Sequence, residues 1–394
     1  MQYEGITVGV PKEIMQGEKR GAIVPESVRS LVGNGARVLV EAGTGDGALW
    51  DDRDYAEAGA EVLPGPLDVY SSANVFLKVK EPLFNEELGR HEADMLPEGS
   101  TLVCFLHPAN PSNHETIGLL AERGIRSFTL DGVPRISRAQ KMDALTAMST
   151  AAGYKAVLLA ADYLPRFIPM MPTAFGVIKP AEFLVIGTGI AGLQAVATAR
   201  RLGAKVKTLD IRPEANEQAK SLGADVIFFD VPHELSVGRE GYAMRLPEEW
   251  YRKEREAVTA HLKDADAVIL TALIPGERAP ILVDGEMVEK MKKGSVIIDI
   301  AIDQGGNCQL TEAGKTSLHA DTWICGMKNV PARLPVDSTW MFSRSAVHFL
   351  SYIIKDGTIN ADIDDEIIKG TLVTVDGRIV HRGTLEAMGE SPRG

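Results

Sequence analysis

One glycine-rich segment constrains the fold of this 394-residue chain more than any other part of the sequence. Residues 187–192 read GTGIAG, and they lie between a strand-like run at 182–186 and a helix-like run at 193–202. In a G-x-G-x-x-G turn of this kind, the glycines permit a tight turn, close approach of backbone amides to a pyrophosphate, and close packing of the helix on the sheet. The segment therefore predicts a dinucleotide-binding α/β domain.

The residue that ends the next strand-like run indicates which dinucleotide binds. Asp210 stands there, where a carboxylate can accept hydrogen bonds from the adenosine ribose hydroxyls and repel a 2′-phosphate. This favours NAD over NADP as the cofactor. Arg212 leaves NADP as an alternative, because a guanidinium binds phosphate well. In the turn itself, we expect the cofactor to contact Gly187, Gly189, Ile190, Ala191 and Gly192.

The chain alternates short β-branched runs with amphipathic segments twice, once before and once after residues 141–164. Such alternation is typical of β-α-β units and parallel sheets. Apolar spacing at 141–164 and 338–355 predicts two long helices. We therefore expect an α/β protein with two doubly wound, Rossmann-like parallel-sheet domains, joined by two long helices with a cleft between the domains. The expected domains are a discontinuous substrate or catalytic domain at 1–140 plus 334–394 and an NAD-binding domain at 141–333.

The composition restricts the partners of the protein. A formal net charge of −12 disfavours nucleic acid and anionic membrane surfaces, which require a basic surface, and a small-molecule substrate suits it better. The most apolar stretch, at 157–171, is interrupted by charged residues and proline well short of the roughly 20 residues that a membrane helix needs. We expect no membrane insertion and, because no export signal begins the chain, a cytoplasmic protein. The cysteines and histidines lack ligand spacing, so we expect no metal.

Several longer segments resemble one family. They are Val10-Pro11-Lys12-Glu13 and the stretches at 133–140, 192–195, 272–276 and 305–308. On these segments the chain resembles the alanine dehydrogenase and proton-translocating nicotinamide nucleotide transhydrogenase family over almost its full length. The match is closest to the soluble NAD(H)-binding component of the transhydrogenase, which residues 241–243 and 375–377 also resemble.

The resemblance to the transhydrogenase component implies further cofactor-binding residues. A set of four positions the nicotinamide in that component, and a loop after the following strand adds two contacts. In this sequence these residues are Arg135, Gln140, Asp143, Thr146, Ala272 and Leu273, with Thr146 standing where the component has serine. The loop at 272–280 contains Pro275-Gly276, which cannot continue a strand and favours a mobile flap.

The resemblance to alanine dehydrogenase implies a second set of residues, for substrate chemistry. Arg20 and Lys80 would hold the substrate carboxylate, since a guanidinium fork and an ammonium together fix its orientation. His107 would be the general acid and base, because its ordinary pKa lies near neutrality. Asp303 would activate water or relay protons, and Asn329 would contact the substrate.

These two sets support different functions. The second set favours an NAD-dependent dehydrogenase that interconverts a small L-amino acid with its 2-oxo acid and ammonia, acting alone. The alternative is the soluble NAD(H)-binding alpha subunit of a proton-translocating NAD(P) transhydrogenase, which passes hydride to NADP on a partner subunit. We expect a homo-oligomer, a dimer or hexamer, and membrane transhydrogenase subunits as partners if the alternative holds. Which amino acid the dehydrogenase would use stays open, because the sequence does not reveal the side-chain pocket.

Overall fold

The computed structural model describes residues 2–238, 243–274 and 278–389 of the chain, which form two compact units. Unit 1 consists of Met1–Met148 and Ala332–Gly394, and unit 2 consists of Ser149–Pro331. The first division falls inside a continuous helix, α6 (Ala144–Tyr163), rather than at its expected start near residue 140. Two expected features lie partly outside the described residues: the middle of the 272–280 loop, at 275–277, and part of the surface insertion at 235–248, at 239–242.

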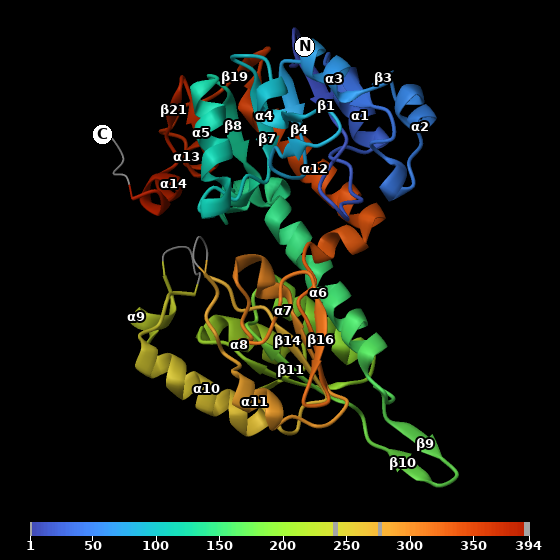
Figure 1. Ribbon diagram of the computed structural model, residues 1–394, viewed down its shortest axis with the longest axis vertical. Helices are drawn as coiled ribbons and strands as arrows, with labels where there is room; N and C mark the ends of the chain where they lie inside the picture. Colours follow the sequence, from blue (N-terminus) through green and yellow to red (C-terminus); the bar gives the residue numbers. More distant parts are fainter. Residues whose placement is uncertain (1, 239–242, 275–277, 390–394) are drawn as a thin grey trace. The chain divides into compact units, whose positions relative to one another are not determined.

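Unit 1 is built on an eight-stranded sheet, six of whose strands are parallel (Figure 1). The antiparallel pairings lie at one edge, where the chain returns to this unit after completing unit 2. In spatial order the strands are β21 (Arg378–Ile379), β20 (Leu372–Val375), β8 (Arg126–Thr129), β7 (Thr101–Cys104), β4 (Val75–Leu77), β1 (Thr7–Val10), β2 (Arg37–Glu41) and β3 (Glu61–Leu63).

Both faces of this sheet are covered, as alternating apolar side chains require. On β4, Val75 and Leu77 belong to one core, whereas Phe76 belongs to the other. The first core contains α1 (Pro25–Gly33) and α12 (Pro335–Ile353), and the second contains α3 (Pro66–Ser72) and α5 (His114–Glu122). Shorter helices are α2 (Asp52–Glu57), α4 (Glu92–Met95), α13 (Glu366–Thr371) and α14 (Arg382–Ala387), and short antiparallel pairs are β5 (Phe84–Asn85) with β6 (Arg90–His91) and β18 (Ile354–Lys355) with β19 (Thr358–Ile359).

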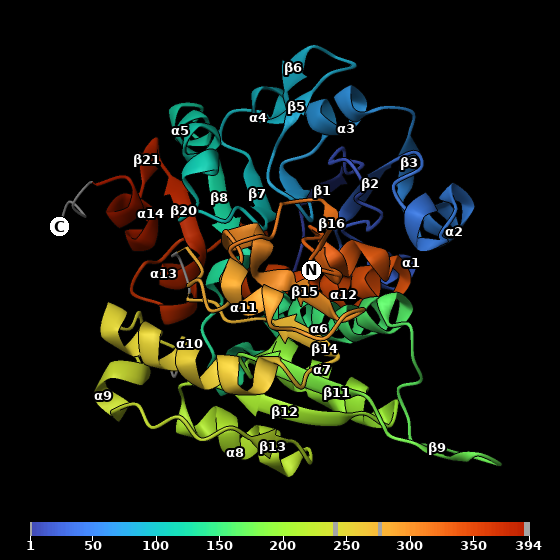
Figure 2. The same ribbon diagram turned by 60° about the horizontal axis from the view of Figure 1, so that its bottom comes forward.

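Unit 2 repeats the doubly wound plan with a seven-stranded sheet. Its order is β13 (Asp225–Val226), β12 (Lys205–Leu209), β11 (Glu182–Ile186), β14 (Ala267–Leu270), β15 (Val296–Asp299), β17 (Thr322–Cys325) and the antiparallel β16 (Thr316–His319). The helices are α7 (Ile190–Arg201), α8 (Pro213–Ser221), α9 (His233–Ser236), α10 (Glu248–Leu262) and α11 (Gly285–Glu289). A hairpin, β9 (Met171–Thr173) and β10 (Gly176–Ile178), extends away from the rest of unit 2 in both views (Figures 1 and 2).

The two long helices differ in their roles. The chain passes from unit 1 to unit 2 along α6, whereas α12 lies wholly in unit 1, where Phe342, Ala346 and Phe349 are buried in the first core. The chain returns to unit 1 in the short 3₁₀ segment Val330–Arg333 instead. By length and composition alone, α6 is the one helix among the described residues that is long and apolar enough to cross a membrane. Its apolar side chains belong to the cores of the two units, with Met148 in one and Val157 in the other.

Candidate functional site

The G-x-G-x-x-G segment of unit 2 forms a closed turn with one open position. Gly187 has φ +85°, and a Cβ there would lie 2.8 Å from the Ala272 nitrogen. A Cβ on Gly192 would lie 2.0 Å from the Gly187 oxygen, so helix α7 can pack against the turn only with glycine at this position. A Cβ on Gly189 would meet only Arg212 Nη2, at 3.9 Å. The turn therefore leaves room for a ligand at Gly189, where α7 begins.

Two further observations fit a dinucleotide at this turn. No side chain caps the first turn of α7 among the described residues, so its N-terminal amides suit a pyrophosphate. The Thr188 hydroxyl is buried and meets no hydrogen-bond partner in the described part of the chain. Ile190 and Ala191 occupy the first two positions of α7, beside Gly189. The predicted residues of the turn are thus brought together in the geometry that the sequence predicts.

Asp210, at the end of β12, is tied to the protein more completely than the sequence suggests. Its Oδ2 accepts hydrogen bonds from the Thr188 backbone N–H (2.6 Å) and Arg212 Nη2 (2.8 Å). Its Oδ1 accepts from the Arg212 backbone N–H and from Arg212 Nε, both at 2.9 Å. The Asp210 residue is only 4% exposed. The carboxylate expected to bind ribose is therefore paired with a guanidinium in this structure.

Asn307 fixes both ends of the loop that follows β14. This fully buried amide accepts a hydrogen bond from the Ala272 N–H (3.0 Å) and donates to the carbonyls of Ala272 (2.9 Å) and Pro280 (2.8 Å). Asp299, at the end of β15, in turn accepts from the Asn307 N–H at 2.9 Å. Leu273, the other predicted loop contact, is exposed. The sequence analysis did not assign a role to Asn307, although its segment at 305–308 carries part of the family resemblance.

Asp303 and Asn329, predicted separately, lie together in unit 2. Asp303 is an exposed residue of the 3₁₀ segment Ile300–Gln304 after β15. Its Oδ2 accepts a long hydrogen bond, 3.4 Å, from the backbone N–H of Asn329, whose φ is +50°. Both residues follow the carboxyl ends of parallel strands, where folds of this kind bind ligands.

In unit 1, His107 forms a pair with a residue that the sequence analysis missed. His107 Nδ1 lies 2.8 Å from Asp131 Oδ1, and the His107 backbone N–H donates to Asp131 Oδ2 at 2.8 Å. Thr129 Oγ1 donates to the same Oδ2 at 2.6 Å. The imidazole also stacks on Phe105, with the rings 5.8 Å apart and 5° from parallel. The signal in the sequence is an acid just past β8, the strand beside β7.

The electrostatics of this pair favour the imidazolium. Desolvation alone would lower the pKa of His107, but the charge and hydrogen bond of Asp131 outweigh it, and the pKa of His107 is raised. The positive charge of Lys80 opposes that rise. Burial would raise the pKa of Asp131, yet the charge and hydrogen bond of His107 lower it. An aspartate that orients and charges a histidine in this way is typical of a proton-handling site.

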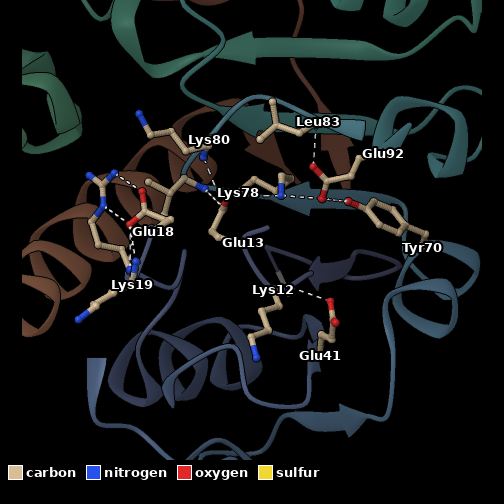
Figure 3. Close-up of polar contacts among 12 residues, drawn as sticks. Lys12, Glu13, Glu18, Lys19, Glu41, Tyr70, Lys78, Lys80, Leu83 and Glu92 are labelled. Carbon is tan, nitrogen blue, oxygen red and sulfur yellow. Dashed lines mark hydrogen bonds and ion pairs between the residues drawn. The ribbon is translucent and has the colours of Figure 1, made fainter. Parts of the chain in front are cut away.

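The expected carboxylate clamp is only partly open to a substrate. Arg20 is buried, and its guanidinium already holds Glu18 through Nε to Oε1 (2.8 Å) and Nη2 to Oε2 (2.6 Å). Its Nη1 faces the Met148 sulfur at 3.0 Å. Lys80 is partly exposed, and its side chain points away from the ion pairs around it (Figure 3). The Glu18 carboxylate thus occupies the fork that was expected to bind a substrate carboxylate.

A buried ion cluster lies beneath Lys80, and the sequence analysis did not identify it. Lys78 Nζ lies 2.8 Å from Glu92 Oε1 and 3.4 Å from Glu13 Oε2, and Tyr70 donates to Glu92 at 3.0 Å (Figure 3). Glu13 also accepts the backbone N–H groups of Val79 (2.5 Å) and Lys80 (3.4 Å). Burial raises the pKa of Glu13 to about 7, against the lowering effect of Lys78. This cluster fixes the backbone that presents Lys80.

The four residues expected at the nicotinamide belong to unit 1 and form two groups. Asp143 and Thr146 are bonded to each other, because Asp143 accepts both the Thr146 backbone N–H (2.8 Å) and its hydroxyl (2.6 Å) at the start of α6. Arg135 and Gln140 are exposed residues, and Gln140 lies in the 3₁₀ segment Ser137–Met142. Across the described residues, no group of three or more His, Cys, Asp or Glu side chains could hold a metal ion.

Two doubly wound α/β units, one with a G-x-G-x-x-G turn built for a dinucleotide, define a nucleotide-dependent oxidoreductase. The chain belongs to the alanine dehydrogenase/PNT family: the N-terminal domain of that family matches residues 9–152, and the C-terminal domain matches residues 156–382. The expected fold class and family are confirmed, and with them an NAD(H)-type nucleotide site.

Three similar proteins indicate where in the family the chain lies. An NAD(P) transhydrogenase subunit alpha chain of Rhodospirillum rubrum is 44% identical, over 95% of this chain and 97% of that protein. A transhydrogenase structure from Sinorhizobium meliloti is 37% identical, with a TM-score of 0.82 over 95% of this chain and 100% of that one. An L-alanine dehydrogenase structure is 29% identical, with a TM-score of 0.81 over 98% and 99% of the two chains. Identity therefore favours the second of the two expected functions over the first.

Proposed function

We propose that this chain is the NAD(H)-binding alpha subunit of a proton-translocating NAD(P) transhydrogenase, which passes hydride to NADP on a partner subunit. The observation that carries the proposal is the 44% identity with the Rhodospirillum rubrum alpha-subunit chain, which extends over nearly the whole of both chains. In this function the protein itself needs a nucleotide site and a docking partner, but no site for a third substrate.

The residues of unit 2 suit this role. NADH, when bound, supplies the hydride. The turn at Gly189 and the N-terminus of α7 bind the pyrophosphate, and Asp210 binds the adenosine ribose. Asn307 holds Ala272 in place beside the turn. The proposal assigns the nicotinamide to Arg135, Gln140 and the bonded pair of Asp143 and Thr146, with NAD preferred over NADP.

Arg20 supports this choice over the amino-acid dehydrogenase. A substrate carboxylate needs a bidentate guanidinium partner, and Glu18 already fills that role with two hydrogen bonds inside the protein. Displacing Glu18 would leave a buried carboxylate unpaired, at a cost of several kcal/mol. The proposal therefore assigns Arg20 a structural role. It also places the chain in the cytoplasm, as a homo-oligomer docked on membrane subunits.

Reconstitution tests the proposal. The purified chain is added to membranes that contain the NADP-binding and membrane-spanning transhydrogenase subunits but lack the alpha subunit. Hydride transfer from NADPH to an NAD analogue with a distinct absorbance is then followed. We expect transfer only in the mixture, and we expect Gly192→Ala to abolish it while Gly33→Ala, whose added Cβ meets open space, preserves it. A mixture without transfer would rule the proposal out.

A second function is favoured by one observation, the His107–Asp131 pair. Hydride exchange between two nicotinamides needs no proton relay, whereas oxidative deamination of an amino acid needs a positioned acid and base. The pair has the 2.8 Å contact and the raised histidine pKa that such a role requires. The test is NADH oxidation by the purified chain alone with a panel of 2-oxo acids and ammonium. Turnover of any of them would establish this second function.

A further inference from the structure

The neighbourhood of Asp210 carries a feature that the dinucleotide fingerprint does not account for. Asp210 and Arg212 lie between the end of β12 and the start of α8 (Figure 2). The Arg212 side chain bends back and binds the carboxylate through Nε and Nη2, at 2.9 and 2.8 Å. The same guanidinium lies nearest to the open side of Gly189. It therefore lies where a bound dinucleotide would meet the carboxylate.

The hydrogen bonds of Asp210 leave no acceptor position for a ribose. An ionised carboxylate offers about four lone-pair sites, two on each oxygen. Here each oxygen accepts two N–H donors: Thr188 N–H and Arg212 Nη2 on Oδ2, and Arg212 N–H and Nε on Oδ1. Ribose hydroxyls can donate to this carboxylate only where the guanidinium withdraws from it.

The charge of the site points the same way. A carboxylate excludes a 2′-phosphate because both are anions, but the paired guanidinium compensates that charge at 2.8 Å. Glu254, a buried acid of α10, does not restore it: burial, with a further contribution from Asp210, raises the pKa of Glu254 to about 8, so it is mostly neutral at pH 7. Glu214, exposed at the start of α8, faces solvent.

We infer that Arg212 sets the nucleotide preference of unit 2, because it occupies the acceptors with which Asp210 would select the ribose of NAD(H) and cancels the charge with which Asp210 would exclude NADP(H). The inference rests on the proposed dinucleotide site. Its consequence is that removing the guanidinium makes the site more selective for NAD(H), which is the opposite of removing a residue that binds the cofactor.

Titration of the full-length protein with NADH and with NADPH, followed by nucleotide fluorescence, tests this. For Arg212→Met we expect the ratio of the NADPH Kd to the NADH Kd to rise about tenfold or more, the effect of one charge-assisted contact. Arg212→Lys, which keeps the charge but loses the fork, should give a smaller rise. Arg252→Met, at an exposed arginine on the surface of α10, is the matched control and should leave the ratio unchanged.

The outcomes separate this inference from the proposed function. An unchanged or lower ratio in Arg212→Met, with wild-type NADH binding intact, would overturn the inference and leave the dinucleotide site standing. Asp210→Asn should lower the ratio below that of the wild type, because Arg212 then faces the nucleotide without a charged partner. Failure of the wild-type chain to bind either nucleotide would overturn the site itself, and the inference with it.

Discussion

Replacing Lys78 by methionine should destabilise unit 1 more than replacing any surface lysine. Lys78 is 1% exposed and lies between two buried carboxylates, Glu92 at 2.8 Å and Glu13 at 3.4 Å. Methionine fills a similar volume without charge, so Lys78→Met leaves two anions facing each other in the protein interior. Removing one partner of a buried ion pair costs about 3–5 kcal/mol. We expect a loss in that range at pH 8, measured by urea unfolding of the full chain.

The pH dependence and a neighbouring lysine provide the controls. The pKa of Glu13 is about 7 in the intact cluster, and the positive charge of Lys78 holds it down, so in Lys78→Met this carboxyl takes up a proton more readily. At pH 5.5 the loss should therefore shrink to about 2 kcal/mol, since only one anion remains. Lys80→Met should cost less than about 0.5 kcal/mol. A loss below about 1 kcal/mol at pH 8, or an equal loss at both pH values, would refute the reasoning.

Three further predictions concern the turn, the loop and the buried acids. Gly192→Ala should abolish NADH binding in a fluorescence titration, because its Cβ would lie 2.0 Å from a carbonyl oxygen, and binding at wild-type strength would contradict the turn geometry. Asn307→Ala removes three buried hydrogen bonds and should cost about 2–4 kcal/mol in urea unfolding and weaken NADH binding; a change under about 1 kcal/mol would contradict its role. Burial raises the pKa of Glu13 to about 7 and of Glu254 to about 8, from 4.5, so the native state binds more protons than the unfolded state between these values. Stability should therefore fall as pH rises from 5 to 8, by up to about 1.4 kcal/mol per unit for each group, and urea unfolding that shows a rise would be inconsistent with both shifts.

The sequence predicts the parts of this molecule that depend on local spacing. The turn at 187–192 follows from three glycines between a strand and a helix, and the structure explains each of the outer two: Gly187 and Gly192 leave no room for a Cβ. The parallel sheets follow from the alternation of apolar strands and amphipathic helices, since every strand of that kind needs cover on both faces. Family resemblance confirms the same fold class.

Tertiary partners could not be predicted, because they lie far apart in the sequence. Asp131 pairs with His107 only because β7 and β8 are neighbours in the sheet, and Lys78 meets Glu13 because β4 lies beside β1. Asn307 reaches back 35 residues to Ala272. Even Glu18, two residues from Arg20, is not recognisable as its partner from the sequence, and that pair bears directly on the choice between the two functions.

The most direct test compares wild-type protein and His107→Ala in two assays. One follows hydride exchange with NADP bound on the membrane partner, and the other follows NADH oxidation by the chain alone with 2-oxo acids and ammonium. The account predicts exchange at similar rates for both proteins and no oxidation by either. Oxidation of NADH by the wild-type chain alone, lowered about 10²–10⁴-fold in His107→Ala as expected for the loss of a positioned acid and base, together with no exchange in the mixture, would contradict it.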